Sequence, residues 1–185
     1  MMKVLTTKFL TVLFAALAAV VPAMAQTDPA PKAFDITLPA GFAEFTSQVQ
    51  KAESPEGTVE TTNWISRAQT GEAVVVTMSK MPGRILDPEK MMDATRDSLL
   101  KSLKATLESE QDVAGEKKST MIQFRSDAAV LQSQLLVDED RLFQVLYVGR
   151  TPEQRSAAGV GQLFSSFKVA AAPKVAEAPA ATPQQ

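Results

Sequence analysis

In the first part of the chain after residue 33, apolar residues either alternate with polar ones or run together in short segments. Residues 34–38 alternate, which predicts a strand with one buried face. Residues 58–67 are rich in β-forming types, and residues 73–78 form the continuous apolar run of a central strand. A Thr-Gly turn separates the last two segments, so we expect them to form a hairpin.

Two longer segments carry the spacing of three and four residues that is typical of an amphipathic helix. The first spans residues 87–108, where Asp87 can cap the backbone amides and Pro88 suits the first helical position. The second spans residues 151–167 and starts with a capping box, in which Thr151 is the cap and the glutamine three residues later reaches back. Both segments are expected to lay an apolar face against a sheet.

Three further strands are predicted at residues 115–125, 128–137 and 141–149. The turn at 138–140 is entirely acidic, which raises the question of calcium. A calcium loop of the EF type needs ligands over twelve residues and a glycine at its bend, so we interpret this turn as a solvated hairpin tip. The order of strands, helix, three strands and helix predicts one α+β domain with a mostly antiparallel sheet covered by helices.

The first 25 residues have the features of a cleavable signal peptide. A basic start precedes a 13-residue apolar run at positions 9–21, which is shorter than the roughly 20 residues that span a bilayer. Ala23 and Ala25 then form the small-x-small pattern of a cleavage site before Gln26. The alternatives are an uncleaved anchor or a buried core helix. We therefore expect export to the periplasm and no stable membrane anchor after cleavage.

Low-complexity segments flank the predicted domain at residues 34–169. Residues 26–33 are polar and proline-containing, and are expected to be a flexible leader. Residues 170–185 are rich in alanine and proline without apolar periodicity, so we expect a disordered tail, which is either a plain tail or a tether for a partner.

Composition narrows the possible functions. Cysteine and histidine are both absent, which excludes disulfides, lipid attachment to cysteine, thiol chemistry and histidine-based catalysis. The chain has 19 basic and 21 acidic residues, and loss of Lys3 and Lys8 with the signal changes the net charge from −2 to −4. This weak acidity argues against nucleic acid and anionic lipid as partners.

The sequence contains few motifs that indicate catalysis or metal binding. Ser98 and Lys101 match the S-x-x-K spacing of penicillin-binding enzymes, but the companion motifs are absent and both residues fall on the polar side of the first helix. Paired carboxylates remain possible in principle, although nothing marks a cleft. Thioethers could hold copper(I), but methionine more often fills core gaps; the methionines concerned are Met78, Met81, Met91 and Met92. We predict no catalytic residue, no cofactor and no metal site.

The turns and core positions resemble those of PsbP/Mog1-like domains, most closely the bacterial periplasmic DcrB-like group. The opening strand F-D-I-T-L-P-A-G-F at 34–42 resembles the start of that domain. The resemblance covers residues 34–169, and its further marks are Leu38-Pro39-Ala40, Trp64, Thr70-Gly71, the strand at 73–78, the strand starting at Gly115, and Phe164-Ser-Ser-Phe167.

The resemblance implies an antiparallel sheet sandwiched by helices, and no chemistry. PsbP-like members are accessory subunits of photosystem II, Mog1-like members bind a small GTPase, and DcrB is a lipid-anchored envelope protein linked to phage entry. This chain lacks the anchoring cysteine.

We therefore expect a periplasmic, non-enzymatic binding or accessory protein that acts through contacts with an envelope protein of unknown identity. The alternatives are a carrier of a small apolar ligand or lipid and an unrecognised hydrolase. No binding residue is assigned. Trp64 would be a hot spot if it were exposed, but a single tryptophan in a strand is more often a core residue.

Overall fold

A computed structural model describes residues 30–170 of the chain. The predicted signal peptide at 1–25 with its cleavage site, most of the predicted leader, and the predicted tail beyond residue 170 lie outside this part. The strands are β1 (Phe34–Asp35), β2 (Thr46–Ser54), β3 (Gly57–Arg67), β4 (Ala73–Lys80), β5 (Thr106–Asp112), β6 (Ser119–Arg125), β7 (Val130–Asp138), β8 (Arg141–Gly149) and β9 (Lys168–Val169). The helices are α1 (Pro88–Leu103), α2 (Pro152–Arg155) and α3 (Ala158–Ser166).

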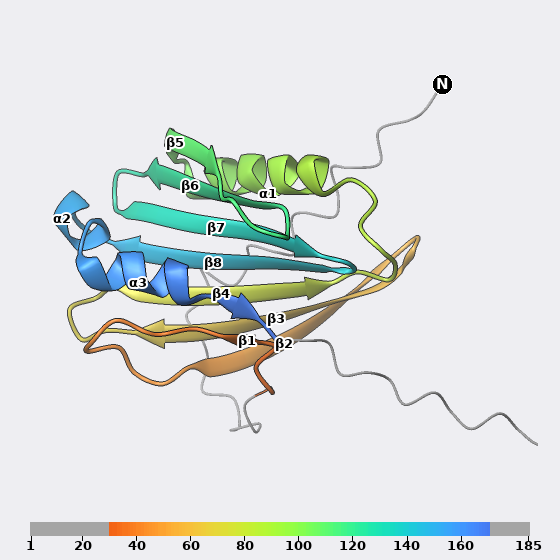
Figure 1. Cartoon of the computed structure of the whole chain (residues 1–185), viewed down its shortest axis with the longest axis horizontal. Helices are drawn as coiled ribbons and strands as arrows, with labels where there is room; N and C mark the ends of the chain where they lie inside the picture. Colours follow the sequence, from red (N-terminus) through yellow and green to blue (C-terminus); the bar gives the residue numbers. More distant parts are fainter. Residues whose placement is uncertain (1–29, 171–185) are drawn as a thin grey trace, which may run out of the picture.

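Seven of the strands form one antiparallel sheet in the order β2-β3-β4-β8-β7-β6-β5 (Figure 1). Neighbours in sequence are mostly neighbours in space, and β4 and β8 join the two halves of the sheet. The two remaining strands, β1 and β9, pair antiparallel in a small separate sheet. The predicted mostly antiparallel α+β architecture is thus confirmed at this level.

Both predicted hairpins are present. β3 pairs with β4 in a register that sets Trp64 opposite Val76. β7 pairs with β8, and Asp138 stands opposite Arg141. Glu139, within the tight turn between them, takes a positive φ of 58°.

Two hydrophobic clusters stabilise the sheet, and the alternation of side chains along β8 separates them. One cluster contains odd-numbered β8 residues together with residues of α3 and β1: Phe34, Trp64, Val74, Val76, Phe143, Val145, Tyr147, Val160, Leu163, Phe164 and Phe167. The other contains even-numbered β8 residues together with residues of α1: Met92, Leu99, Ile122, Phe124, Leu131, Leu135, Val137, Leu142 and Leu146. Residues of α1 and α3 therefore contact opposite faces of the sheet.

The first helix is shorter than predicted. Asp87 caps it as expected, accepting a hydrogen bond from the Lys90 amide at 3.0 Å. The helix ends at Leu103 because Lys104 takes a left-handed conformation with φ 48° and ψ 43°. The expected continuation to residue 108 was wrong, since the next residues form the edge strand β5.

Other boundaries also differ. The predicted helix at 151–167 is two helices, α2 and α3, although its capping box at Thr151 is present. The strand predicted from residue 115 begins at Ser119, and the one predicted over 34–38 is reduced to two residues. Strand β2 was not predicted.

Candidate functional site

A groove of about 480 Å³ opens where β2 and β4 end and β3 begins, beside the β7–β8 turn. In the antiparallel register, Lys51, Glu60 and Lys80 stand in one row across the three strands. Directly opposed residues on antiparallel strands share a face, so these three side chains project together. The full lining is Lys51, Glu53, Thr58, Glu60, Lys80, Met81, Pro82 and Asp140.

The loop after β4 forms one wall of this groove and is held by backbone hydrogen bonds. The Met81 amide donates to the Asp140 carbonyl, and the Ile85 amide donates to the Glu139 carbonyl, both at 2.8 Å. On the opposite side, Gly57 takes a φ of 128°, and a Cβ there would lie 2.8 Å from Cβ of Pro82. The loop after β4 therefore lies so close to the β2–β3 hairpin that a side chain larger than that of glycine does not fit at position 57.

Charge dominates the groove, with two lysines and three carboxylates among its eight lining residues. Lys51 Nζ lies 2.9 Å from Glu60 Oε2, and the two side chains are 64% and 40% exposed. Exposed pairs of this kind exchange partners at little free-energy cost. The groove can therefore offer both signs of charge to a polar partner, and its geometry assigns no acid–base or nucleophilic chemistry.

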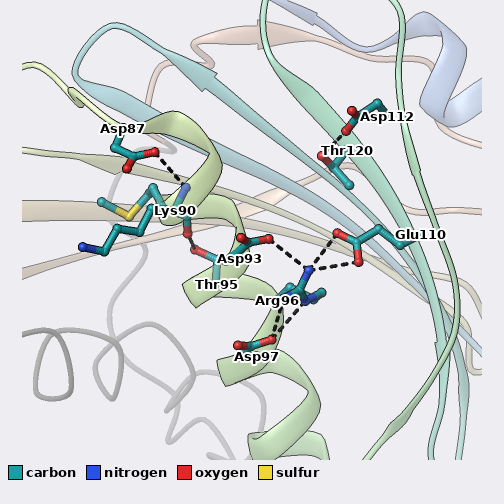
Figure 2. A network of polar contacts seen from close by, with 10 residues as sticks. Asp87, Lys90, Asp93, Thr95, Arg96, Asp97, Glu110, Asp112 and Thr120 are labelled. Carbon is teal, nitrogen blue, oxygen red and sulfur yellow. Dashed lines mark hydrogen bonds and ion pairs between the residues drawn. The ribbon is translucent and has the colours of Figure 1, made fainter.

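A second group of charges joins α1 to β5 and is already satisfied internally. Arg96 lies 3.0 Å from both Asp93 and Glu110 and 2.9 Å from Asp97 (Figure 2). Burial alone would lower the pKa of Arg96, but hydrogen bonds from its guanidinium to Asp97 and Glu110 outweigh it and raise that pKa. This group fixes the helix against the edge strand, and its charges are paired within the chain.

Glu108 holds a third group together. It stands at an irregularity in the β5–β6 ladder, where the register shifts between Leu107 and Ser109. Its carboxylate pairs with Arg125 at 2.7 Å and also with Arg155, the last residue of α2. Hydrogen bonds from these two guanidinium groups lower the pKa of Glu108.

The acidic turn at 138–140 is less exposed to solvent than the hairpin tip predicted from the sequence. The Asp138 side chain is 11% exposed and pairs with Lys117 at 2.7 Å and with Arg141. Burial would raise the pKa of Asp138, but these two cations outweigh it and hold the pKa below its usual value. Within residues 30–170, no group of three or more histidine, cysteine, aspartate or glutamate residues could hold a metal ion.

Trp64 is a core residue rather than an exposed hot spot. It is 1% exposed, and its ring meets that of Phe34 edge to face with 5.0 Å between centroids. Its indole N–H donates to the Ala30 carbonyl at 3.2 Å. The core interpretation of this tryptophan is confirmed.

The other candidates named from the sequence are not brought together as sites. Ser98 and Lys101 lie on α1, half-buried and exposed respectively, with no hydrogen bond between their side chains among the described contacts. Of the four methionines, Met78 packs with the α3-side cluster, whereas the other three, Met81, Met91 and Met92, pack with the α1-side cluster. They fill gaps in two separate cores.

The groove itself escaped prediction from the sequence. Its charged residues come from three strands and the β7–β8 turn, and one of these strands, β2, has no alternating apolar pattern. The available signal was the run of charges of both signs at Lys51, Glu53 and Glu60, on either side of the β2–β3 turn.

Comparison with solved structures gives a likeness of fold. The chain is similar to the solution structure of cyanobacterial PsbP (CyanoP) from Synechocystis sp. PCC 6803, with a TM-score of 0.48 and 11% sequence identity. The match covers 80% of this chain and 99% of that chain. The likeness is to a PsbP-like fold, and it says nothing about a partner or an activity of this chain. No family model and no curated protein matches the sequence.

No helix within residues 30–170 has both the length and the apolar character needed to cross a membrane.

Proposed function

We propose that this chain is an exported, periplasmic binding or accessory protein that acts through contacts with another envelope protein and performs no catalysis. We also propose that its fold is a PsbP/Mog1-like sandwich and that it belongs to the DcrB-like group. The export signal predicted at residues 1–25 supports the periplasmic location, and the lack of cysteine and histidine supports a role without catalysis.

The groove between the ends of β2 and β4 and the start of β3 is the observation that carries the proposal. It is open, about 480 Å³ in volume, and lined mainly by charged side chains. Pockets for small apolar ligands are lined mostly by apolar side chains, whereas charged and polar groups of both signs give protein contacts their specificity. The groove therefore favours a charged protein surface over a lipid.

The test is affinity capture by residues 26–185 from a periplasmic extract of the host, with mass spectrometry of proteins and lipids. Lys80→Glu reverses one charge inside the groove, and Lys90→Glu makes the same change on the exposed side of α1. We expect one protein to be captured by the wild type and by Lys90→Glu, and to be lost with Lys80→Glu.

Two outcomes would contradict the proposal. Equal capture of that protein by both variants would remove the groove as the contact surface. Lipid at about one molecule per chain, without any protein, would identify a carrier instead.

A further inference from the structure

The two edges of the seven-stranded sheet differ in how they are protected against further strands. Edge strands with unpaired backbone groups accept other strands unless bulges, charges or prolines prevent it. At β5 the register shifts around Glu108, and acidic residues occupy three of its seven positions. The side chain of Glu108 is also engaged by Arg125 and Arg155. Strand β5 is therefore a protected edge.

Strand β2, at the other edge, has none of these protections apart from single charges. Its nine residues pair with β3 in nine consecutive steps without a register shift, and β2 contains no proline. Among residues 30–170 it pairs with no strand other than β3, so one row of its backbone groups lacks a strand partner. Val49, in the middle of β2, leaves 48% of its surface exposed.

We propose that β2 pairs antiparallel with β2 of a second copy of this chain, joining two seven-stranded sheets edge to edge. In a two-fold register centred on Ala52, Lys51 of each copy stands opposite Glu53 of the other. The same register sets Gln50 opposite Ser54 and brings Val49 opposite Pro55 of the β2–β3 turn. Each pair has its side chains on one face of the joined sheet.

Charge complementarity indicates that the strand pairing with β2 is β2 of a second copy of this chain. The short sequence Lys51-Ala52-Glu53 is self-complementary when read antiparallel, because its two ends carry opposite charges. A register shifted by one residue, centred on Lys51, would set lysine against lysine, which is destabilising. This self-association goes beyond the proposed binding function, although Lys51 and Glu53 also border the groove.

Charge reversal on each side of this pairing supplies the test, measured by sedimentation equilibrium of residues 26–185 at concentrations up to about 500 µM. Lys51→Glu alone sets glutamate against glutamate twice across the two-fold axis, and Glu53→Lys alone sets lysine against lysine twice. We expect each to weaken self-association by about tenfold or more, since two attractive pairs become repulsive. Lys90→Glu is the control and should leave self-association unchanged.

An equimolar mixture of the two variants distinguishes pairing in this register from simple damage to the fold. In the mixed dimer, glutamate of one copy again faces lysine of the other at both positions, so association should return to the wild-type level. A wild-type chain that remains monomeric throughout the concentration range would overturn the proposal. Failure of the mixture to associate, with both variants folded by circular dichroism, would overturn it as well.

Discussion

The ion pairs of Asp138 make the β7–β8 turn a test of how charge stabilises this fold. Asp138→Asn keeps the shape of the side chain but removes its charge from Lys117 and Arg141. The Arg141 side chain is only 12% exposed, so it would keep a largely buried cation without its carboxylate. Lys117 is 42% exposed and contributes little. We expect a loss of about 2 kcal/mol in the free energy of unfolding at pH 7, mostly from Arg141.

Urea unfolding followed by circular dichroism measures this loss. With a slope of about 2 kcal/mol per molar urea, the midpoint should fall by about 1 M. Asp140→Asn is the matched control, because that carboxylate makes no ion pair among the described contacts. It should shift the midpoint by less than about 0.3 M.

The pH dependence has a defined sign. The pKa of Asp138 is lower in the folded chain than in the unfolded chain. Its stabilisation is therefore fully present above the unfolded pKa of about 4 and is lost as pH falls through the folded value. The gap between wild type and Asp138→Asn should therefore narrow as pH falls below about 4. An equal midpoint for the two proteins at pH 7, or a gap that stays constant down to pH 2, would refute the reasoning.

Two further predictions concern packing. Gly57→Ala should cost about 2 kcal/mol in a urea titration, because its φ of 128° and its approach to Pro82 both exclude a Cβ. Gly83→Ala, with nothing within 4 Å of the added Cβ, should be near neutral, and equal costs would contradict the argument. In thermal unfolding, Leu99→Ala should cost about 3 kcal/mol, since this α1 side chain is 1% exposed. Leu107→Ala, 40% exposed on β5, should cost no more than about 0.5 kcal/mol, and the reverse order would show that α1 does not hold the core.

Elements with a local signal could be predicted from the sequence. The β3–β4 and β7–β8 hairpins were marked by apolar runs on either side of short turns, and both formed as expected. The start of α1 was correct because Asp87 and Pro88 act through neighbouring backbone atoms alone. Signals of this kind need no knowledge of the rest of the chain.

The predictions from the sequence were wrong or incomplete where contacts between distant segments determine the structure. Strand β2 contains one large apolar residue in nine, so its sequence carries almost no hydrophobic pattern that would predict its pairing with β3. The four-residue spacing from Leu103 to Leu107 predicts that the first helix continues to residue 108. The left-handed turn at Lys104 ends it, and the next residues pair with β6 instead. The groove was unpredictable for the same reason, since it exists only once three strands and a loop are assembled.

The pairing of β1 with β9 sets how the domain responds to mechanical force. Phe34 lies opposite Val169, and the Ala170 amide donates to the Ala33 carbonyl at 2.9 Å, so the first and last strands lie side by side. A pull applied to both ends of the chain meets the hydrogen bonds of Ala30 first and then this pair, whose hydrogen bonds open one after another from the end where Phe34 faces Val169. Phe34 then leaves its aromatic neighbours before the large sheet bears any load. The domain therefore yields from its ends at low force while its hairpins stay closed.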